Sequence, residues 1–412
     1  MNRYDWIKLA DKKFFSKIKD ISTLGVANVI PTVIGGLFWF YIASLIDVDQ
    51  YGEINYIIAI AGIAGVISYL GSTTTITVYS AKGLDVIPAI VVLVLIFSSI
   101  ASLVIFIFIQ DLGATIYVLG FVIFGIILAD IIGKKLYKNY AIYSILQRIL
   151  MVIFSITLYY LIGYHGIVLG ISLSFLPFSI KLYQTVKGHK LDFALLKINK
   201  NFIVNNYVLD LAKTFSGSAD KLIIGPLFGF IILGNYQLGI QFLALLIIIP
   251  HSVFQYVLPH DATGQLNTKI KKFAIIISVI MAAVGVVFAP VVLSSLFPKF
   301  TNADEIVRIV SLTIIPMTIN LMYISEFLGK LQSNLVLKGS VIFIGIQILG
   351  IIILGNLFGV NGIAWSLVLA STAESCYLFS IARYYKSSTK NLNQWIKKIG
   401  NIINKSWILK LN

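Results

Sequence analysis

Apolar residues fill this chain in about twelve long segments, separated by short polar gaps. Each segment has roughly the 20 residues that a helix needs to cross the hydrocarbon core of a bilayer. Lipid offers the backbone no hydrogen-bond partner, so helices are expected. The pattern predicts an all-α polytopic membrane protein with spans at 24–46, 54–79, 87–109, 114–132, 142–162, 166–184, 206–228, 233–257, 273–296, 306–328, 335–355 and 361–384.

Lysine and arginine are concentrated in every second gap between the segments. The chain has 32 lysine and arginine residues, and 28 of them lie in the two tails, in alternate gaps or at the span ends beside those gaps. The other four are Lys213, Lys221, Lys299 and Arg308. Cytoplasmic loops of membrane proteins carry this kind of excess. The distribution predicts a multi-pass protein of the cell membrane with both termini cytoplasmic. It also explains the net charge of +15 without nucleic acid as a partner.

The longest basic gap divides the segments into two sets of six. We expect an N-terminal lobe over 24–184, a cytoplasmic linker over 185–205 and a C-terminal lobe over 206–384. The flanking stretches 1–23 and 385–412 mix lysine with tryptophan and isoleucine, which predicts basic amphipathic helices at the cytoplasmic headgroup level. Such helices either attract anionic lipids and lipid-linked substrates or only anchor the chain.

The motifs of several enzyme classes are missing. The sequence has no ATP-binding loop, no H-E-x-x-H and, with Cys376 alone, no cysteine pair. Ser218 and Lys221 fit the S-x-x-K spacing of acyl-serine enzymes, but the companion motifs are absent. A membrane glycan polymerase or ligase would need catalytic groups in a large external loop, and the external gaps are short. We therefore expect no enzyme, and no cofactor or metal.

Polar residues inside the segments are costly in lipid and are therefore functional candidates. On a helical wheel, the charged and hydroxyl residues of the seventh segment share an arc of about 120°. They are Asp210, Lys213, Thr214, Asp220 and Lys221, with Ser218 at the border. In the eighth segment, an arc of about 80° holds Gln237, Gln241, His251 and Gln255. Such stripes are expected to face other helices or a wet cavity.

Other segments add single polar residues to this set. They are Asn28 in the first, Arg148 in the fifth, Asn320 in the tenth and Glu374 in the twelfth. Structural explanations stay open for some candidates. Asp210 and Lys213 can simply neutralise each other, and His251 is equally suited to packing and to carrying a proton. Asp130 and Lys134 are expected to form a structural pair at i,i+4.

Five stretches, in order along the chain, resemble a known family. They are Ile42–Glu53, Ser218–Gly229, Leu233–Gln237, Val257–Pro259 and Phe358–Trp365. Asp49–Gly52 is also echoed by Leu233–Tyr236, as expected of two duplicated halves. Together these stretches are similar to the polysaccharide-biosynthesis flippases of the multidrug/oligosaccharidyl-lipid/polysaccharide exporter (MOP) superfamily.

The resemblance implies two six-helix lobes around a central cavity. It implies a transporter that flips a polyprenyl-(pyro)phosphate-linked oligosaccharide to the outer leaflet by alternating access, driven by a proton or sodium gradient. Its partners would be membrane lipids, the lipid-linked oligosaccharide and other polysaccharide-assembly proteins. The alternative within the superfamily is a cation-coupled drug or metabolite antiporter.

The resemblance also suggests roles for the polar residues. Phosphate or sugar would contact Arg148, Lys213 and Lys221. The cavity would be lined further by Ser218, Gln237, Gln241, Gln255, Asn28 and Asn320. The coupling proton or sodium ion would use Asp210, Asp220, Glu374 or His251. Cavities in the family are often rich in arginine, whereas here the first lobe has only Arg148 near its interior.

Overall fold

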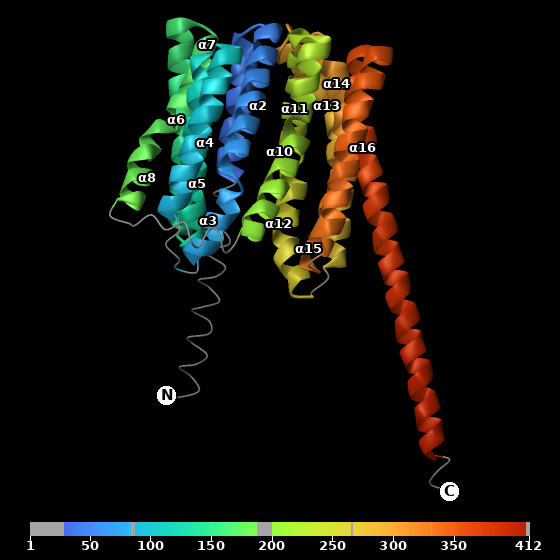
Figure 1. Ribbon diagram of the computed structural model, residues 1–412. Coiled ribbons are helices and arrows are strands. Elements are labelled where there is room, and N and C mark those ends of the chain that lie inside the picture. Colours follow the sequence, from blue (N-terminus) through green and yellow to red (C-terminus); the bar gives the residue numbers. More distant parts are fainter. Residues whose placement is uncertain are drawn as a thin grey trace, which may run out of the picture.

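The computed structural model describes residues 29–81, 83, 87–187, 200–264, 267–330 and 332–408, and within these ranges the regular structure is entirely helical (Figure 1). The predicted all-α class is confirmed. Asn28, the N-terminal stretch and most of the linker lie outside the described residues.

After a first helix, Val29–Leu45, the elements are α2 (Val48–Tyr69), α3 (Ser72–Ala81), α4 (Ile87–Ile109), α5 (Leu112–Gly133), α6 (Tyr137–Ile162), α7 (His165–Leu173), η1 (Leu176–Phe178), α8 (Ser179–Val186), α10 (Lys200–Phe228), α11 (Phe230–Leu246), α12 (Ile248–Ala262), α13 (Thr268–Leu296), α14 (Ala303–Leu312), α15 (Ile314–Gly329) and α16 (Ser333–Ile408).

Every predicted span corresponds to a helix or to a broken pair of helices. Eight helices in the described ranges are long and apolar enough to cross a membrane, or nine with the α11–α12 pair, which bends by 48°. The predicted twelve are completed by the first helix, the charged helix α10 and a second arm of α16. The second span breaks between α2 and α3, where Leu70 and Gly71 adopt φ values of 52° and 71°. Broken spans leave backbone groups for neighbouring helices to satisfy.

The last helix is a hairpin of two antiparallel arms. Gly359, with φ 58° and ψ −138°, interrupts α16. A Cβ added at Gly350 would lie 2.7 Å from Ser366, and one at Gly362 would lie 1.9 Å from the Leu354 carbonyl oxygen. These contacts place the two arms side by side, and both pairs are centred on Phe358, next to Gly359. The glycines therefore allow two spans to follow each other without a loop, and the second arm continues beyond the bundle to Ile408 (Figure 1).

The helices form two lobes, each with its own buried apolar cluster. The N-lobe, from the first helix to α8, is centred on aliphatic and aromatic residues such as Phe124, Phe175 and Phe178. The C-lobe, from α10 to α16, is centred on Ile224, Leu233 and its aliphatic neighbours. The first cluster also includes C-lobe residues such as Leu238, Leu293 and Val307, so it continues across the contact between the two lobes.

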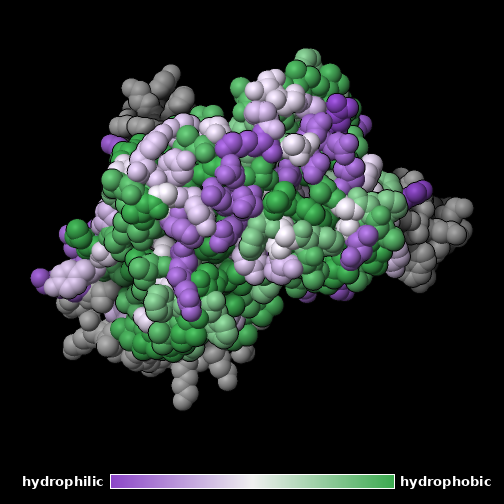
Figure 2. All heavy atoms as spheres, turned by 90° about the horizontal axis from the view of Figure 1, so that it is seen from above, coloured by the Kyte–Doolittle hydropathy of each residue, from purple (hydrophilic) through white to green (hydrophobic). Residues whose placement is uncertain are grey.

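The lobes meet closely at one end of the bundle, the top in Figure 1, which we call the far end; the opposite end is the near end. Here α2 crosses α11 backbone to backbone. A Cβ at Gly52 would lie 2.0 Å from the Phe230 carbonyl oxygen, and one at Gly234 would lie 2.0 Å from that of Val48. Hydrophilic residues gather toward the middle of the far-end face (Figure 2). Gly52 and Gly234 lie in the two internal echoes, so the echoed stretches of the two halves touch.

Candidate functional site

A cavity of about 460 Å³ separates the first helix from α11 and α12. It is lined by Val29, Thr32, Ala244, Ile247, Ile248, His251, Ser252 and Gln255. The ring nitrogen Nδ1 of His251 lies 3.4 Å from Nε2 of Gln255. Two residues of the predicted polar stripe of the eighth span therefore face a cavity between the lobes.

The first helix brings Arg148 and Gln241 to the same region. A Cβ at Gly35 would lie 4.0 Å from the Arg148 guanidinium, and one at Gly36 would lie 3.9 Å from Gln241 Nε2. The Arg148 side chain is partly buried, with Nη1 3.5 Å from the sulfur of Met151. No carboxylate pairs with Arg148 within the described ranges. A cation with no charge partner thus stands beside the inter-lobe space.

The predicted stripe on α10 does not face a single cavity. At one end, the Thr73 hydroxyl donates to Oδ2 of Asp210 at 3.1 Å, which joins α3 to α10 across the lobes. The side chain of Lys213, like the whole of Asn28, lies outside the description. Ser218 is partly buried farther along the helix.

At the other end of the stripe, Asp220 is buried inside the C-lobe. Its carboxylate accepts the Lys221 backbone N–H at 2.8 Å and lies 3.5 Å from Lys221 Nζ. The Tyr236 hydroxyl approaches Asp220 and Gln347. Tyr236 Oη, Gln347 Oε1 and Gln237 Oε1 are buried without a hydrogen-bond partner in the described structure. This region therefore concentrates oxygen atoms with unused hydrogen-bonding capacity, an unfavourable arrangement in a dry interior.

A second buried polar cluster joins α15 to the second arm of α16. Asn320 Nδ2 donates to Glu374 Oε2 at 2.9 Å and to the Ser371 carbonyl oxygen at 3.1 Å. The Ser375 hydroxyl donates to Asn320 Oδ1 at 2.6 Å. Glu374 is 8% exposed and has no cationic partner among the described side chains. The structure thus places the predicted residues Asn320 and Glu374 in direct contact.

Sequence reasoning missed a buried ion pair at the near end of the C-lobe. Lys271 Nζ lies 2.6 Å from Asp261 Oδ2, and the Ser325 hydroxyl donates to the same oxygen at 2.7 Å. The Asp261 side chain is 1% exposed. Lys271 looked like an ordinary basic loop residue. Its position only three residues inside α13 was the one available signal that it could turn into the bundle.

Similarity to known proteins lies in the fold. The chain resembles an inward-facing multidrug resistance MATE family transporter of the MOP superfamily, with TM-score 0.68, 17% identity and coverage of 90% of this chain and 99% of that one. It resembles the lipid II flippase MurJ in an inward closed conformation, with TM-score 0.70, 13% identity and 87% of each chain covered. It also resembles an outward-facing multidrug resistance MATE family transporter, with TM-score 0.60, 17% identity and coverage of 90% of this chain and 96% of that one.

No protein-family model matches the chain, and no curated protein matches it in sequence. The structural similarities nevertheless extend over almost the full length of the chain and of the transporters compared with it. They agree with the two lobes described above. The chain is a multi-pass membrane protein with the two-lobed, twelve-helix fold of MOP-superfamily transporters.

Proposed function

We propose that this transporter flips a polyprenyl-(pyro)phosphate-linked oligosaccharide between leaflets by alternating access. The observation that carries the proposal is Arg148, a partly buried guanidinium beside the inter-lobe space without a carboxylate partner among the described residues. A guanidinium stays charged even when buried, and an uncompensated charge inside a membrane bundle is unfavourable. A phosphate or pyrophosphate would neutralise it through two parallel hydrogen bonds.

The cavity between the first helix and α12 supports an inward-open starting state. The lobes touch at the far end through Gly52 and Gly234, whereas the cavity at Thr32 and His251 separates them farther toward the near end. We propose that the near end is cytoplasmic because alternate gaps on that side carry most of the lysine and arginine. A lipid-linked sugar would enter this cavity from the side while its polyprenyl chain stays in the bilayer.

Transport would be coupled to a proton or sodium gradient through the C-lobe. Glu374 and Asp220 are the deepest carboxylates of the predicted set. Glu374 lies beside the Asn320 amide and is in none of the ion pairs of the described residues, whereas Asp220 lies 3.5 Å from Lys221 Nζ, so Glu374 is the first candidate. A carboxylate in such a setting can take up one proton or one sodium ion. Asp210 is less suited to this role because the Thr73 hydroxyl already bonds it across the lobes.

A cation-coupled drug or metabolite antiporter is the second candidate. The cavity volume of about 460 Å³ lies within the range of small-molecule pockets, and Val29, Ile247 and Ile248 give it an apolar wall. An antiporter would bind a cationic substrate and would gain nothing from Arg148. The charge preference of the cavity therefore separates the two candidates.

Flipping in proteoliposomes tests the proposal. A labelled lipid-linked oligosaccharide is placed where only one leaflet is open to a sugar-cleaving enzyme. Arg148→Ala should slow protein-dependent flipping by at least about tenfold. The flipping rate of Arg148→Lys should lie between those of the wild type and Arg148→Ala, since lysine keeps the charge but cannot form two parallel hydrogen bonds. Arg308→Ala, at an exposed arginine on α14, is the matched control and should flip normally.

The same liposomes test coupling and the alternative. In Glu374→Gln, an imposed proton or sodium gradient should no longer stimulate flipping. In Asp130→Asn, which changes a near-end carboxylate of the N-lobe, the gradient should still stimulate flipping. Gradient-driven efflux of a small organic cation, without flipping of any polyprenyl-linked sugar, would establish the antiporter instead. Normal flipping by Arg148→Ala would remove the main support for the flippase.

A further inference from the structure

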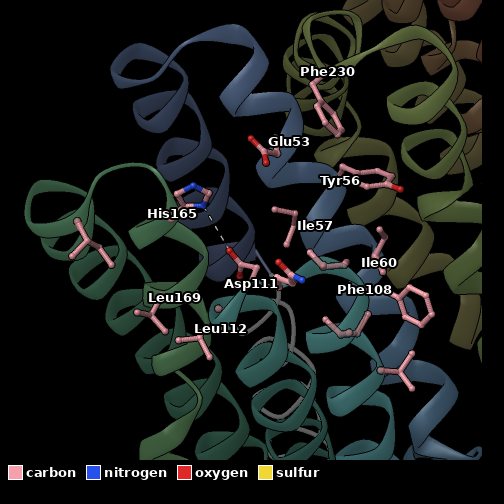
Figure 3. A pocket seen from close by; sticks show the side chains of 16 residues that line it. Glu53, Tyr56, Ile57, Ile60, Phe108, Asp111, Leu112, His165, Leu169 and Phe230 are labelled. Carbon is pink, nitrogen blue, oxygen red and sulfur yellow. Dashed lines mark ion pairs between the residues drawn. The ribbon is translucent and has the colours of Figure 1, made fainter.

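A large cavity lies away from the inter-lobe site, at the far end of the N-lobe. Its volume is about 840 Å³, and it lies between α2, the turn from α4 to α5, the start of α7 and Phe230 of α11. Glu53, Asp111 and His165 line one part of it, each from a different element (Figure 3). The remaining wall is mostly aliphatic and aromatic. The cavity therefore combines an acidic part, which we call the acidic mouth, with an apolar wall.

The acidic charge at this mouth is only partly compensated. Asp111 accepts the Ala114 N–H at 2.7 Å, and its second oxygen lies 3.7 Å from Nδ1 of His165. Glu53 has no cationic partner in the described part of the chain. Burial, then the negative charge of Glu53 and its acidic neighbours, raises the pKa of the adjacent Tyr164 hydroxyl. The mouth thus favours a positively charged group.

A second, apolar cavity adjoins this one on the side toward the middle of the bundle. It has a volume of about 300 Å³, lies between α2 and α4, and shares Val104 and Ile105 with the first; we call it the groove. Its wall is formed by Ala64, Ile67, Phe97, Ile100 and Ala101. From Phe97 to Phe108, α4 rises by about 16 Å at 1.5 Å per residue. This length is close to one leaflet, or about half of a 30 Å hydrocarbon core.

We propose that the acidic mouth and the groove together bind one lipid of the far-end leaflet whose headgroup carries an ammonium group. The ammonium would lie beside Glu53, and an acyl chain would follow the groove between α2 and α4. An anionic headgroup is disfavoured by the charge of the mouth. The two cavities therefore match both the charge and the length of a single lipid.

The site would be sensitive to the state of the transporter. Phe230 belongs to the C-lobe, yet it lines the cavity and its ring lies 5.4 Å from that of Tyr56 on α2. Separation of the lobes at the far end would remove this wall. The lipid would therefore favour the conformation in which the far end is closed, because a ligand shifts the equilibrium toward the state it binds better.

Native mass spectrometry of the full-length protein in detergent provides the test. The delipidated protein is titrated with phosphatidylethanolamine and with phosphatidylglycerol of identical acyl chains. Phosphatidylethanolamine should bind more tightly, and Glu53→Gln should weaken it about tenfold. Asp304→Asn, at the start of α14 in the C-lobe, is the matched control for charge and should bind like the wild type.

The groove is tested by filling it. Ala101→Phe should reduce binding of both lipids, whereas Ala283→Phe, on an exposed position of α13, should not. Glu53→Gln is isosteric and decides the question if Ala101→Phe does not fold. Equal binding of the two lipids, preference for the anionic one, or unchanged binding by Glu53→Gln would overturn the proposal. The assay measures no transport, so its outcome is independent of the flipping test.

Discussion

The two lobes share a helical plan but differ in what fills their interiors. In the N-lobe, aromatic rings pack on one another, as Phe124 does on Phe178 at 4.8 Å between centroids. In the C-lobe, carboxylates and amides occupy the corresponding depth, as in the contact of Asn320 with Glu374. Ring packing resists rearrangement, whereas a polar cluster can change with its protonation or ion occupancy. The difference suggests a stiff lobe and an adjustable one.

Each lobe has one cluster of a carboxylate, a lysine and a hydroxyl group at the near end, and the two clusters differ in how far the lysine is exposed. In the N-lobe, Asp130 accepts the Ser80 hydroxyl at 2.8 Å and pairs with Lys134 at 2.8 Å. This confirms the structural pair expected from the sequence. The Lys134 side chain is 46% exposed, whereas its C-lobe counterpart Lys271 is 11% exposed. Both carboxylates are therefore buried, but the lysine reaches water in the N-lobe and is enclosed in the C-lobe.

The largest expected effect breaks the buried cluster. Lys271→Met leaves Asp261 buried without its cation and should lower the free energy of unfolding by about 3–5 kcal/mol. Lys134→Met removes the cation of a pair whose lysine is 46% exposed, so water can reach the vacated position beside Asp130, and the free energy of unfolding should fall by only about 1 kcal/mol. Denaturant unfolding in detergent, followed by tryptophan fluorescence, measures both. Equal losses would mean that the burial difference has no energetic weight.

A smaller effect compares one amide in each lobe. Asn320→Leu removes the bonds that Asn320 makes to Glu374, Ser371 and Ser375, and should lower the free energy of unfolding by about 2–3 kcal/mol. In the N-lobe, Gln147→Met removes a single bond to the Ser174 hydroxyl, 2.9 Å long, and should lower it by about 1 kcal/mol. The same unfolding assay applies, and a reversed order would contradict the contrast between the lobes.

The contact between the lobes can be tested with glycines of α2. Gly52→Ala would put a methyl group 2.0 Å from a backbone oxygen of α11 and should destabilise the closed far end by about 1–3 kcal/mol. On the same helix, a Cβ at Gly62 would meet no atom within 4 Å, so Gly62→Ala should raise the free energy of unfolding by about 0.5–1 kcal/mol. Spin-label distances across the far end should widen only for Gly52→Ala. Unchanged distances would show that the crossing does not hold the lobes together.

The smallest effect concerns the ion pair between Lys299 and Asp47, which also joins the lobes, at 2.9 Å. Both side chains are at least half exposed, so Lys299→Ala should change the free energy of unfolding by about 0.2–1 kcal/mol. The difference from the wild type should vanish in 1 M salt, where the screening length falls to about 3 Å. A larger, salt-independent loss would make this pair, rather than the glycines, the main contact.

The sequence was sufficient for the helices and insufficient for the polar partners. Hydrophobic length placed the spans because a membrane constrains each helix separately. The contact of Asn320 with Glu374 joins two residues that are 54 positions apart in the sequence and lie on different helices, and a helical wheel relates only residues of one helix. The bend between α11 and α12 also breaks the wheel on which Gln237 and His251 shared a face. Arg148 was identified from its type alone, and only the fold placed it beside the first helix.

The crossing of Gly52 and Gly234 has a consequence for the electrical insulation of the membrane. The backbones of α2 and α11 approach so closely there that no side chain fits between them. Each elementary charge that leaks across 100 mV dissipates about 2.3 kcal/mol of the membrane's stored energy. A carrier with a wet interior must therefore be sealed at one end at every moment. Under the proposed function, the close approach of the two helices at Gly52 and Gly234 would be part of that seal.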